Sequence, residues 1–363
     1  MRLLYYRPRK VLRADPDRFP GFTKFSRFFD IYGPGVVIVD RTATIRMPIK
    51  LKALAPLPAF EGFTKTYEEI CDARAREILS KADVADVDVC VSWSGGIDST
   101  LVLISLLKMG SNEQKRRIVV LLSEESITEN PRFWEEHIHG KLRVDSSVLF
   151  SHRLGTKDVL LDGEHNDQLF GSDVVGKLIH QLGDEHLHKP YSRDLFSDFF
   201  GRSLGDQATT DFYLDLFERL KAAAPLSIET NFLYLWWINF ALKWQAVHLR
   251  RLLHTAPRNI RNIDQRYIDT KYVHFFGTDD FQRWSMANPD KRIKDTWNTY
   301  KWPAKDIIYD YTKDREYRDS KIKRGSLKAL FLQQHSYSFI DEKLGFHDDL
   351  SPETYYEPHN DFS

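Results

Sequence analysis

The sequence VDVCVSWSGGIDSTLVLISLLKM, residues 87–109, decides the fold of this chain. From Val87 to Trp93 apolar residues alternate with small or polar ones, and Asp88 is the only charged residue, which favours a strand buried on both faces of a sheet. From Leu101 to Leu107 the chain is apolar nearly all round, as in a buried helix. The six residues between them, SGGIDS at 94–99, therefore form a tight loop that joins a strand to a helix.

This loop has the chemistry of a phosphate site. The first N–H groups of a helix have no intrahelical partner and carry a partial positive charge, which suits phosphate oxygens. Two glycines allow a close backbone approach, and two serines add hydroxyl donors. Asp98 would repel a bare phosphate, so it indicates the Mg²⁺ ion that accompanies nucleotide phosphates. We therefore expect Ser94, Gly95, Gly96, Asp98 and Ser99 to bind a metal nucleotide; an ordinary Ser/Gly-rich turn is the alternative.

Two further buried strands are predicted at Ile118–Leu122 and Val159–Leu161. Together with the first strand they indicate an α/β fold with a parallel sheet, in which ligands lie beyond the carboxyl ends of the strands. Leu122 and Ser123 are thus expected beside the loop, close to the nucleoside.

The third strand runs into DGEHNDQLFG, residues 162–171. Glu164 and Asp167 leave the sheet at the edge where Asp98 is expected, and three converging acids are costly unless a divalent metal or a cationic substrate neutralises them. An acidic helix N-terminus is the alternative explanation for these two residues.

Two segments of the chain resemble one family. SGGIDS resembles the pyrophosphate-binding loop (PP-loop) of the N-type ATP pyrophosphatases, the adenine nucleotide alpha hydrolase superfamily. DGEHNDQLFG resembles the GEGADELFGGY segment of the synthetase domain of asparagine synthetase. Near residue 323, KIKRG is similar to the family's R-x-K-x-G segment, and KWPAK at 301–305 is more weakly similar to a lysine-containing helix start. The resemblance covers roughly residues 66–326.

The resemblance implies an ATP-dependent, AMP-forming amide ligase, in which a substrate carboxylate is adenylated and then attacked by ammonia or an amine. By the same resemblance ATP and Mg²⁺ are bound, Glu164 positions or deprotonates the nitrogen nucleophile, and Lys323 stabilises the charge that develops in the reaction. The residues expected to hold the nucleotide are Ser94, Gly95, Gly96, Asp98, Ser99, Leu122, Ser123 and Gly163. Asp98 and Asp167 are expected to bind Mg²⁺.

The chain also departs from the family. Position 2 is Arg2 rather than a nucleophilic cysteine, and the leading region is too short for a glutaminase domain. Free ammonia, a separate amidotransferase or an amine substrate is therefore expected to supply nitrogen. His165 and Asn166 replace small residues, Gln168 replaces an acid, and residues 274–280 lack the family's substrate segment, so the carboxylate substrate need not be aspartate.

Two other functions stay open on the sequence. The first is a PP-loop enzyme that modifies a nucleobase in tRNA or DNA, and the second is a non-catalytic nucleotide-binding subunit. Lys+Arg and Asp+Glu are equal at 52 each, with no basic block, which disfavours nucleic acid as a partner.

The composition and the sequence pattern also predict where the protein is located and how it divides into domains. With only two cysteines, no apolar signal segment, and an apolar run at residues 232–242 too short to span a bilayer, a cytoplasmic protein without membrane contact is expected. We expect a small β-rich N-terminal lobe over 1–60, with a hairpin of residues 36–39 and 42–47. The ATP pyrophosphatase domain is expected over 61–330, covered by a helical C-terminal layer, followed by a loosely ordered tail over 331–363.

Overall fold

The structure is a computed structural model that describes residues 1–11, 13–32, 36–60, 62–255, 265–322, 337–360 and 362. Its contacts divide the chain into two compact units, each built from separate stretches of sequence. The first unit comprises Met1–Phe60, Asp167–Leu253 and His335–Ser363, and the second comprises Glu61–Asn166 and His254–Gln334. This division differs from the expected one, because residues 167–253 group with the two ends of the chain rather than with the sheet that carries the loop.

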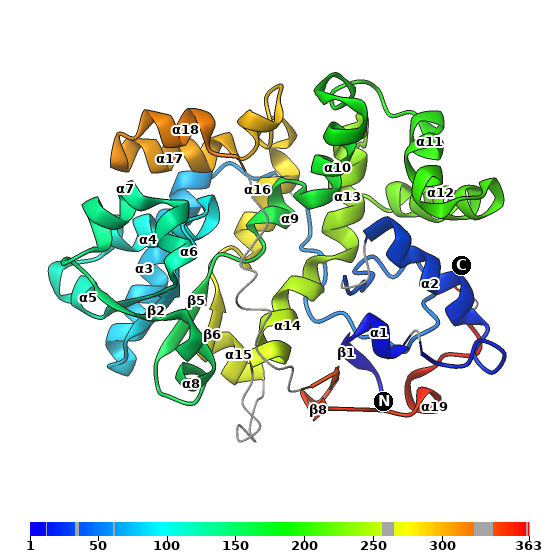
Figure 1. Cartoon of the computed structure of the whole chain (residues 1–363), viewed down its shortest axis with the longest axis horizontal. Coiled ribbons are helices and arrows are strands. Elements are labelled where there is room, and N and C mark those ends of the chain that lie inside the picture. The colour runs from blue at the N-terminus through cyan, green and yellow to red at the C-terminus, as the bar shows by residue number, and fades with distance from the viewer. Residues whose placement is uncertain are drawn as a thin grey trace. The chain divides into compact units, whose positions relative to one another are not determined.

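The second unit is organised around a five-stranded parallel sheet, with strand order β4-β3-β2-β5-β6 (Figure 1). Val89 in β2 pairs with Ile118 in β3 on one side and with Val159 in β5 on the other, so β2 is central. The expected α/β class with a parallel sheet is confirmed. The strands are β2 (Val89–Ser92), β3 (Ile118–Leu122), β4 (Arg143–Ser146), β5 (Val159–Asp162) and β6 (Tyr272–His274).

The order of these strands reverses at β2. From β2 the chain moves outward to β3 and β4, then returns to the other side of β2 for β5 and β6. The switch point therefore lies between β2 and β5, and the loops that follow these two strands leave the same edge of the sheet. The arrangement is compatible with a Rossmann-like fold, in which ligands bind at such a switch point.

The helices of the second unit begin and end where local signals place them. Thr66 and Glu69, which have the spacing of a capping box in the sequence, form that box ahead of α3, and Gly110 is the C-cap of α4. α3, α4 and α17 pack together, and α18 lies beside α17 (Figure 1). The elements are α3 (Tyr67–Ala85), α4 (Ile97–Met109), α5 (Asn112–Arg116), α6 (Glu124–Glu129), α7 (Pro131–Phe133), the π-helical turn η1 (Trp134–Ile138), the 3-10 turns η2 (Ser147–Leu149), η4 (Pro289–Lys291) and η5 (Trp297–Thr299), α8 (Phe150–Leu154), α15 (Gln265–Lys271), α16 (Asp279–Ala287), α17 (Trp302–Thr312) and α18 (Arg315–Ser320).

The first unit combines helices with a three-stranded antiparallel sheet of order β1-β7-β8. Its central helix α13 is buried along its whole length, as the apolar run at 232–242 predicted. The elements are β1 (Leu3–Tyr6), α1 (Pro8–Val11), α2 (Gly21–Tyr32), α10 (Ser172–Leu182), η3 (Asp184–His186), α11 (Arg193–Leu204), α12 (Gln207–Ala222), α13 (Asn231–Leu242), α14 (Trp244–Thr255), β7 (Phe339–Asp341), β8 (Phe346–His347) and α19 (Pro352–Tyr355), while α9 (Asn166–Phe170) lies at the boundary of the two units.

The expected hairpin at residues 36–47 is wrong. Asp40 uses its carboxylate to accept the backbone N–H groups of Thr42, Thr44 and Ile45, which closes a local turn instead of a strand pair. The N–H of Val39 donates to the Leu242 carbonyl, 2.9 Å away, so it too is bonded outside a hairpin. The described residues among the first 60 therefore contribute one strand and two helices, and do not form a β-rich lobe.

The expected loose C-terminal tail is also wrong for its described residues. β7 pairs antiparallel with β1 and so joins the two ends of the chain in one sheet. Tyr355 and Phe362 are buried, and Phe362 packs edge-on against Phe25 of α2 with ring centroids 5.3 Å apart. Aromatic burial, which the acidic composition after residue 348 concealed, fixes this segment.

The sequence pattern of residues 213–220 and 228–253 is that of two helices, which we expected to cover the sheet. Helices are present there, but they belong to the first unit, and the second segment is divided into α13 and α14. Both cysteines are free and buried, and burial raises the pKa of Cys90 to about 12, which keeps its thiol protonated at neutral pH. Within the described ranges, none of the helices has the length and apolar content needed to cross a bilayer.

Candidate functional site

The loop at 94–99 connects β2 to α4, as the sequence predicted. Gly95 has a left-handed backbone with φ of 74°, and a Cβ atom there would lie 2.4 Å from the carbonyl oxygen of Ser126 and 2.9 Å from the Cβ of Glu129. Only glycine fits such a position. The loop is thus held directly against the segment that follows β3, which is where Leu122 and Ser123 lie.

The two loop serines bond to each other. The hydroxyl oxygens of Ser94 and Ser99 are 3.0 Å apart, and the Ser99 oxygen also accepts the backbone N–H of Ser94 at 3.0 Å. Gly96 is the N-cap of α4, and no side chain in the described chain caps this helix end. The loop therefore presents the partial positive charge of a 13-residue helix together with two hydroxyl groups, which are the features that bind phosphate.

Leu122 and Ser123 end β3 beside this loop. Leu122 is partly exposed at the last position of the strand, and Ser123 is the N-cap of α6, where its backbone N–H donates to the Ser126 hydroxyl at 3.3 Å. Their placement agrees with the expected edge of the sheet.

The loop after β5 meets the loop after β2 at Gly163. A Cβ atom on Gly163 would lie 3.0 Å from the carbonyl carbon of Asp98 and 3.2 Å from the backbone nitrogen of Ser99. This close approach brings the two loops together at the switch point of the sheet. Glu164 follows in the turn, partly exposed, and its backbone N–H donates to the Asp162 carboxylate at 3.1 Å.

Two of the expected site residues lie outside the described part of the second unit. Asp167 lies in the first turn of α9 and is assigned to the first unit, whereas Asp98, Gly163 and Glu164 belong to the second. Lys323 lies outside the described residues. The convergence of the three acids therefore stays a prediction.

Asp98 is held by partners from two other elements. The ammonium of Lys301 lies 2.7 Å from Oδ1 and 2.6 Å from Oδ2 of Asp98, and the side-chain N–H₂ of Asn166 donates to Oδ1 at 2.6 Å. The Lys301 side chain is 2% exposed and that of Asp98 is 24% exposed. The negative charge of the loop is therefore matched by a buried cation of this chain.

Strained backbone occurs on both sides of Asp98. Lys301, the N-cap of α17, has φ of 60°, and His165, which precedes Asn166, has φ of 75°. Left-handed backbone is unfavourable for residues other than glycine and is concentrated at functional sites. Lys301 itself binds Asp98, and His165 lies next to Asn166, which also binds Asp98.

Two buried tyrosines support the loops from behind. The Tyr67 hydroxyl donates to Oδ1 of Asn166 at 2.6 Å, and the Tyr317 hydroxyl donates to the carbonyl of Gly95 at 3.3 Å. Burial raises the pKa of both tyrosines, so both remain protonated donors at neutral pH.

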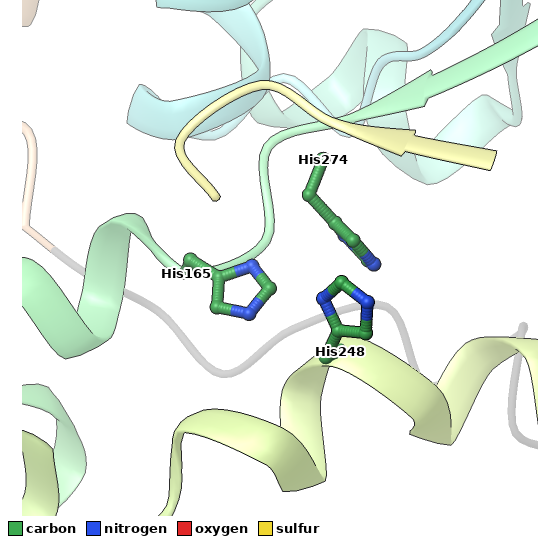
Figure 2. Close-up of side chains that lie close together, drawn as sticks. All are labelled: His165, His248 and His274. Atoms are coloured by element: carbon green, nitrogen blue, oxygen red, sulfur yellow. The ribbon is translucent and has the colours of Figure 1, made fainter. Parts of the chain in front are cut away.

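A second polar cluster lies at the ends of β5 and β6. The Asp162 carboxylate accepts the Tyr272 hydroxyl at 2.7 Å and lies 2.8 Å from Nδ1 of His274, and both Asp162 and His274 have side chains that are 2% exposed. Figure 2 shows the imidazole of His165 beside that of His274, with ring centroids 4.8 Å apart and planes at 81°. This cluster fixes the start of the loop that carries Gly163 and Glu164.

A cavity of about 340 Å³ lies near the loop, in the second unit. At its edge the Lys321 ammonium lies 2.5 Å from a carboxylate oxygen of Glu129, the residue packed against Gly95. The cavity is lined by Thr128, Glu129, Asn130, Pro131, Arg132, Asp314, Glu316, Tyr317, Ser320, Lys321 and Ile322.

The residues fit a nucleotide phosphate more directly than they fit Mg²⁺. Gly95 and Gly96 form a cradle in which a Cβ on Gly95 would clash, and the uncapped start of α4 supplies donors. Both Asp98 oxygens already accept N–H groups, so a metal ion at this carboxylate requires Lys301 to move. Asp98 and Glu164 are oxygen donors of the type that Mg²⁺ prefers.

Sequence reasoning missed Asn166 and Tyr67 and gave Lys301 no role at the site. The signal for Lys301 was the KWPAK resemblance, which was too weak to assign a function. Asn166 stood in the informative DGEHN segment but was counted only as a departure from the family. A scan against models of known families and a search of curated proteins both found no match to this chain.

Proposed function

We propose that this chain is an ATP-dependent, AMP-forming amide ligase, similar to the synthetase part of asparagine synthetase and to other PP-loop enzymes. The observation that carries the proposal is the meeting of the SGGIDS loop with the Gly163–Glu164 turn at the switch point of the sheet. A phosphate-binding helix start and a carboxylate for the nucleophile are both needed within one such site.

In the proposed reaction a carboxylate oxygen of the substrate attacks the α-phosphorus of ATP, and pyrophosphate leaves with the electrons of the broken P–O bond. Nitrogen then attacks the acyl carbon, gives up a proton, and AMP leaves. Ser94, Gly95, Gly96 and Ser99 would bind the pyrophosphate portion, and Asp98 would hold Mg²⁺, which when bound would supply positive charge for that leaving group.

Three other residues of the second unit act on the attacking nitrogen and on the phosphorus. Glu164, half-buried beside Gly163, accepts the proton of the attacking amine or ammonia. Lys301 and Lys321 lie on the two sides of the loop and supply positive charge where the pentavalent phosphorus develops negative charge. We propose a small-molecule or peptide carboxylate as substrate, with ammonia, an amine or a separate amidotransferase as the nitrogen source.

The test is the exchange of labelled pyrophosphate into ATP, measured with Mg²⁺ and a panel of carboxylates that includes aspartate. We expect exchange with one class of carboxylate and amide formation only after ammonium or an amine is added. Asp98→Asn should lower exchange roughly 1,000-fold, about 4 kcal/mol of transition-state stabilisation. Asp88→Asn is the matched control, since Asp88 precedes β2 at the end of that strand remote from the loop, and pairs with Arg143.

The alternatives give different results in the same assay. AMP release that requires tRNA or DNA would identify an enzyme that modifies a nucleobase. Nucleotide binding without exchange for any carboxylate would identify a binding subunit, and full activity of Asp98→Asn would contradict the role of Asp98.

A further inference from the structure

The carboxylate of Asp98 has two competing uses. Its Oδ1 accepts N–H groups from both Lys301 and Asn166, and its Oδ2 accepts a second N–H from Lys301 at 2.6 Å. A Mg²⁺ ion binds carboxylate oxygens at about 2.0–2.1 Å, which leaves no room for an ammonium in the same direction. Lys301 and Mg²⁺ therefore compete for the oxygens of this carboxylate, and their like charges repel each other there.

The backbone of Lys301 is fixed while its ammonium can move. The Lys301 N–H donates to the Arg292 carbonyl at 3.0 Å, and the Lys301 carbonyl accepts the N–H of Lys305 at 3.1 Å. A lysine ammonium is carried on a flexible four-carbon stem, so its transfer to a neighbouring oxygen needs rotation of side-chain bonds and no movement of the backbone. An ammonium displaced from Asp98 remains beside the first turn of α4, because Asp98 is the second residue of that helix.

We propose that Lys301 is an exchangeable phosphate ligand: it neutralises Asp98 when no nucleotide is bound and transfers to a phosphate oxygen when pyrophosphate or a nucleotide enters. The inference rests on the proposed function only in taking pyrophosphate as the ligand. It implies that the loop binds pyrophosphate without a metal, and that Mg²⁺ afterwards takes the oxygens that Lys301 has left.

The test is calorimetric titration of the full chain with inorganic pyrophosphate in the presence of EDTA. We expect the unmodified chain to bind, and Lys301→Met to bind at least tenfold more weakly. Asp98→Asn should bind about tenfold more tightly, since it removes both a negative charge and the competing acceptor for Lys301. Adding Mg²⁺ should strengthen binding by the unmodified chain but have little effect on Asp98→Asn.

Two variants guard against a trivial loss of folding. Lys313→Met is the matched control, because Lys313 has the same left-handed backbone at the other end of α17 but an exposed side chain, and it should bind like the unmodified chain. The double variant Asp98→Asn with Lys301→Met removes both charges together and should fold, as judged by circular dichroism, yet bind pyrophosphate more weakly than Asp98→Asn alone.

If Lys301 and Asp98 formed only a structural ion pair, Lys301→Met would not weaken pyrophosphate binding selectively and Asp98→Asn would not strengthen it. The proposal is overturned by absence of binding in EDTA, by Lys301→Met binding as tightly as the unmodified chain, or by weaker binding of Asp98→Asn. Because no turnover is measured, these results are separate from the exchange assay. An inactive chain with the expected binding pattern would refute the ligase function alone, and an active chain without that pattern would refute the role of Lys301 alone.

Discussion

Asp98 and Asp162 lie at the carboxyl ends of adjacent strands, yet they are bound in different ways. Asp162 ends β5, and its partners Tyr272 and His274 come from the neighbouring strand β6 through short, rigid side chains. Asp98 is bound by the long side chain of Lys301, which comes from the start of a helix two hundred residues later. Permanent packing stabilises the first carboxylate, whereas the second has a partner that can leave.

The largest expected effect tests the permanent cluster. Asp162→Ala leaves the Tyr272 hydroxyl and the His274 N–H buried without their acceptor, and should lower the free energy of unfolding by about 4 kcal/mol. Urea denaturation followed by circular dichroism measures the loss. Asp310→Ala, an exposed acid of α17, serves as the control and should change stability by no more than about 0.5 kcal/mol. A loss below about 1 kcal/mol for Asp162→Ala would show that this cluster is as replaceable as the pair at Asp98.

The sequence predicted the part of this comparison that depends on local pattern. Strands at 118–122 and 159–161, the loop between β2 and α4, and the capping box at Thr66 all follow from short-range periodicity and from side chains within a few residues of one another. The carboxyl ends of these strands were expected at one edge of the sheet by the rule for parallel sheets, which needs no knowledge of distant contacts.

What the sequence did not predict depends on pairing across long separations. Nothing near Asp98 indicates that its charge is met by Lys301, and nothing near Phe339 indicates that it pairs with Tyr6 of the first strand. The hairpin at 36–47 was wrong because β-branched residues gave the local pattern of strands while Asp40 captured the backbone donors. Such outcomes are set by tertiary competition, which local propensity does not contain.

Lys305 of α17 is a second buried lysine, but it donates to a carbonyl group, whereas Lys301 pairs with a carboxylate. Lys305 lies one turn after Lys301, is 2% exposed, and donates to the Asn298 carbonyl at 2.6 Å. Burial lowers the pKa of Lys305 to about 8, with the charge of Asp319 opposing that shift. In the unfolded chain the pKa returns to the ordinary value of 10.5, so the unfolded state binds more protons between pH 8 and 10.5.

Lys305→Met should therefore stabilise the fold at pH 7 by about 2 kcal/mol, because it removes a charge that folding desolvates. For the unmodified chain this group makes stability rise as the pH increases from 8 to 10.5, so the advantage of Lys305→Met should shrink over that range. Urea denaturation at pH 7, 8.5 and 9.5 checks both the sign and the trend. An equal difference at all three values would mean that Lys305 does not titrate in this window.

The smallest expected effects come from removing one tyrosine hydroxyl near each of the two carboxylates. Tyr272→Phe removes a hydroxyl that bonds Asp162 directly, and Tyr67→Phe removes one that orients Asn166 behind Asp98. Each should cost about 1 kcal/mol of stability in urea denaturation, as expected for one buried hydrogen bond. Only Tyr67→Phe should also weaken pyrophosphate binding in calorimetry, by roughly threefold, because a loosened Asn166 no longer shares Asp98 with Lys301 in a fixed geometry. Equal binding by the two variants would place Asn166 in the permanent framework together with Asp162, and would leave Lys301 as the only exchangeable partner of Asp98.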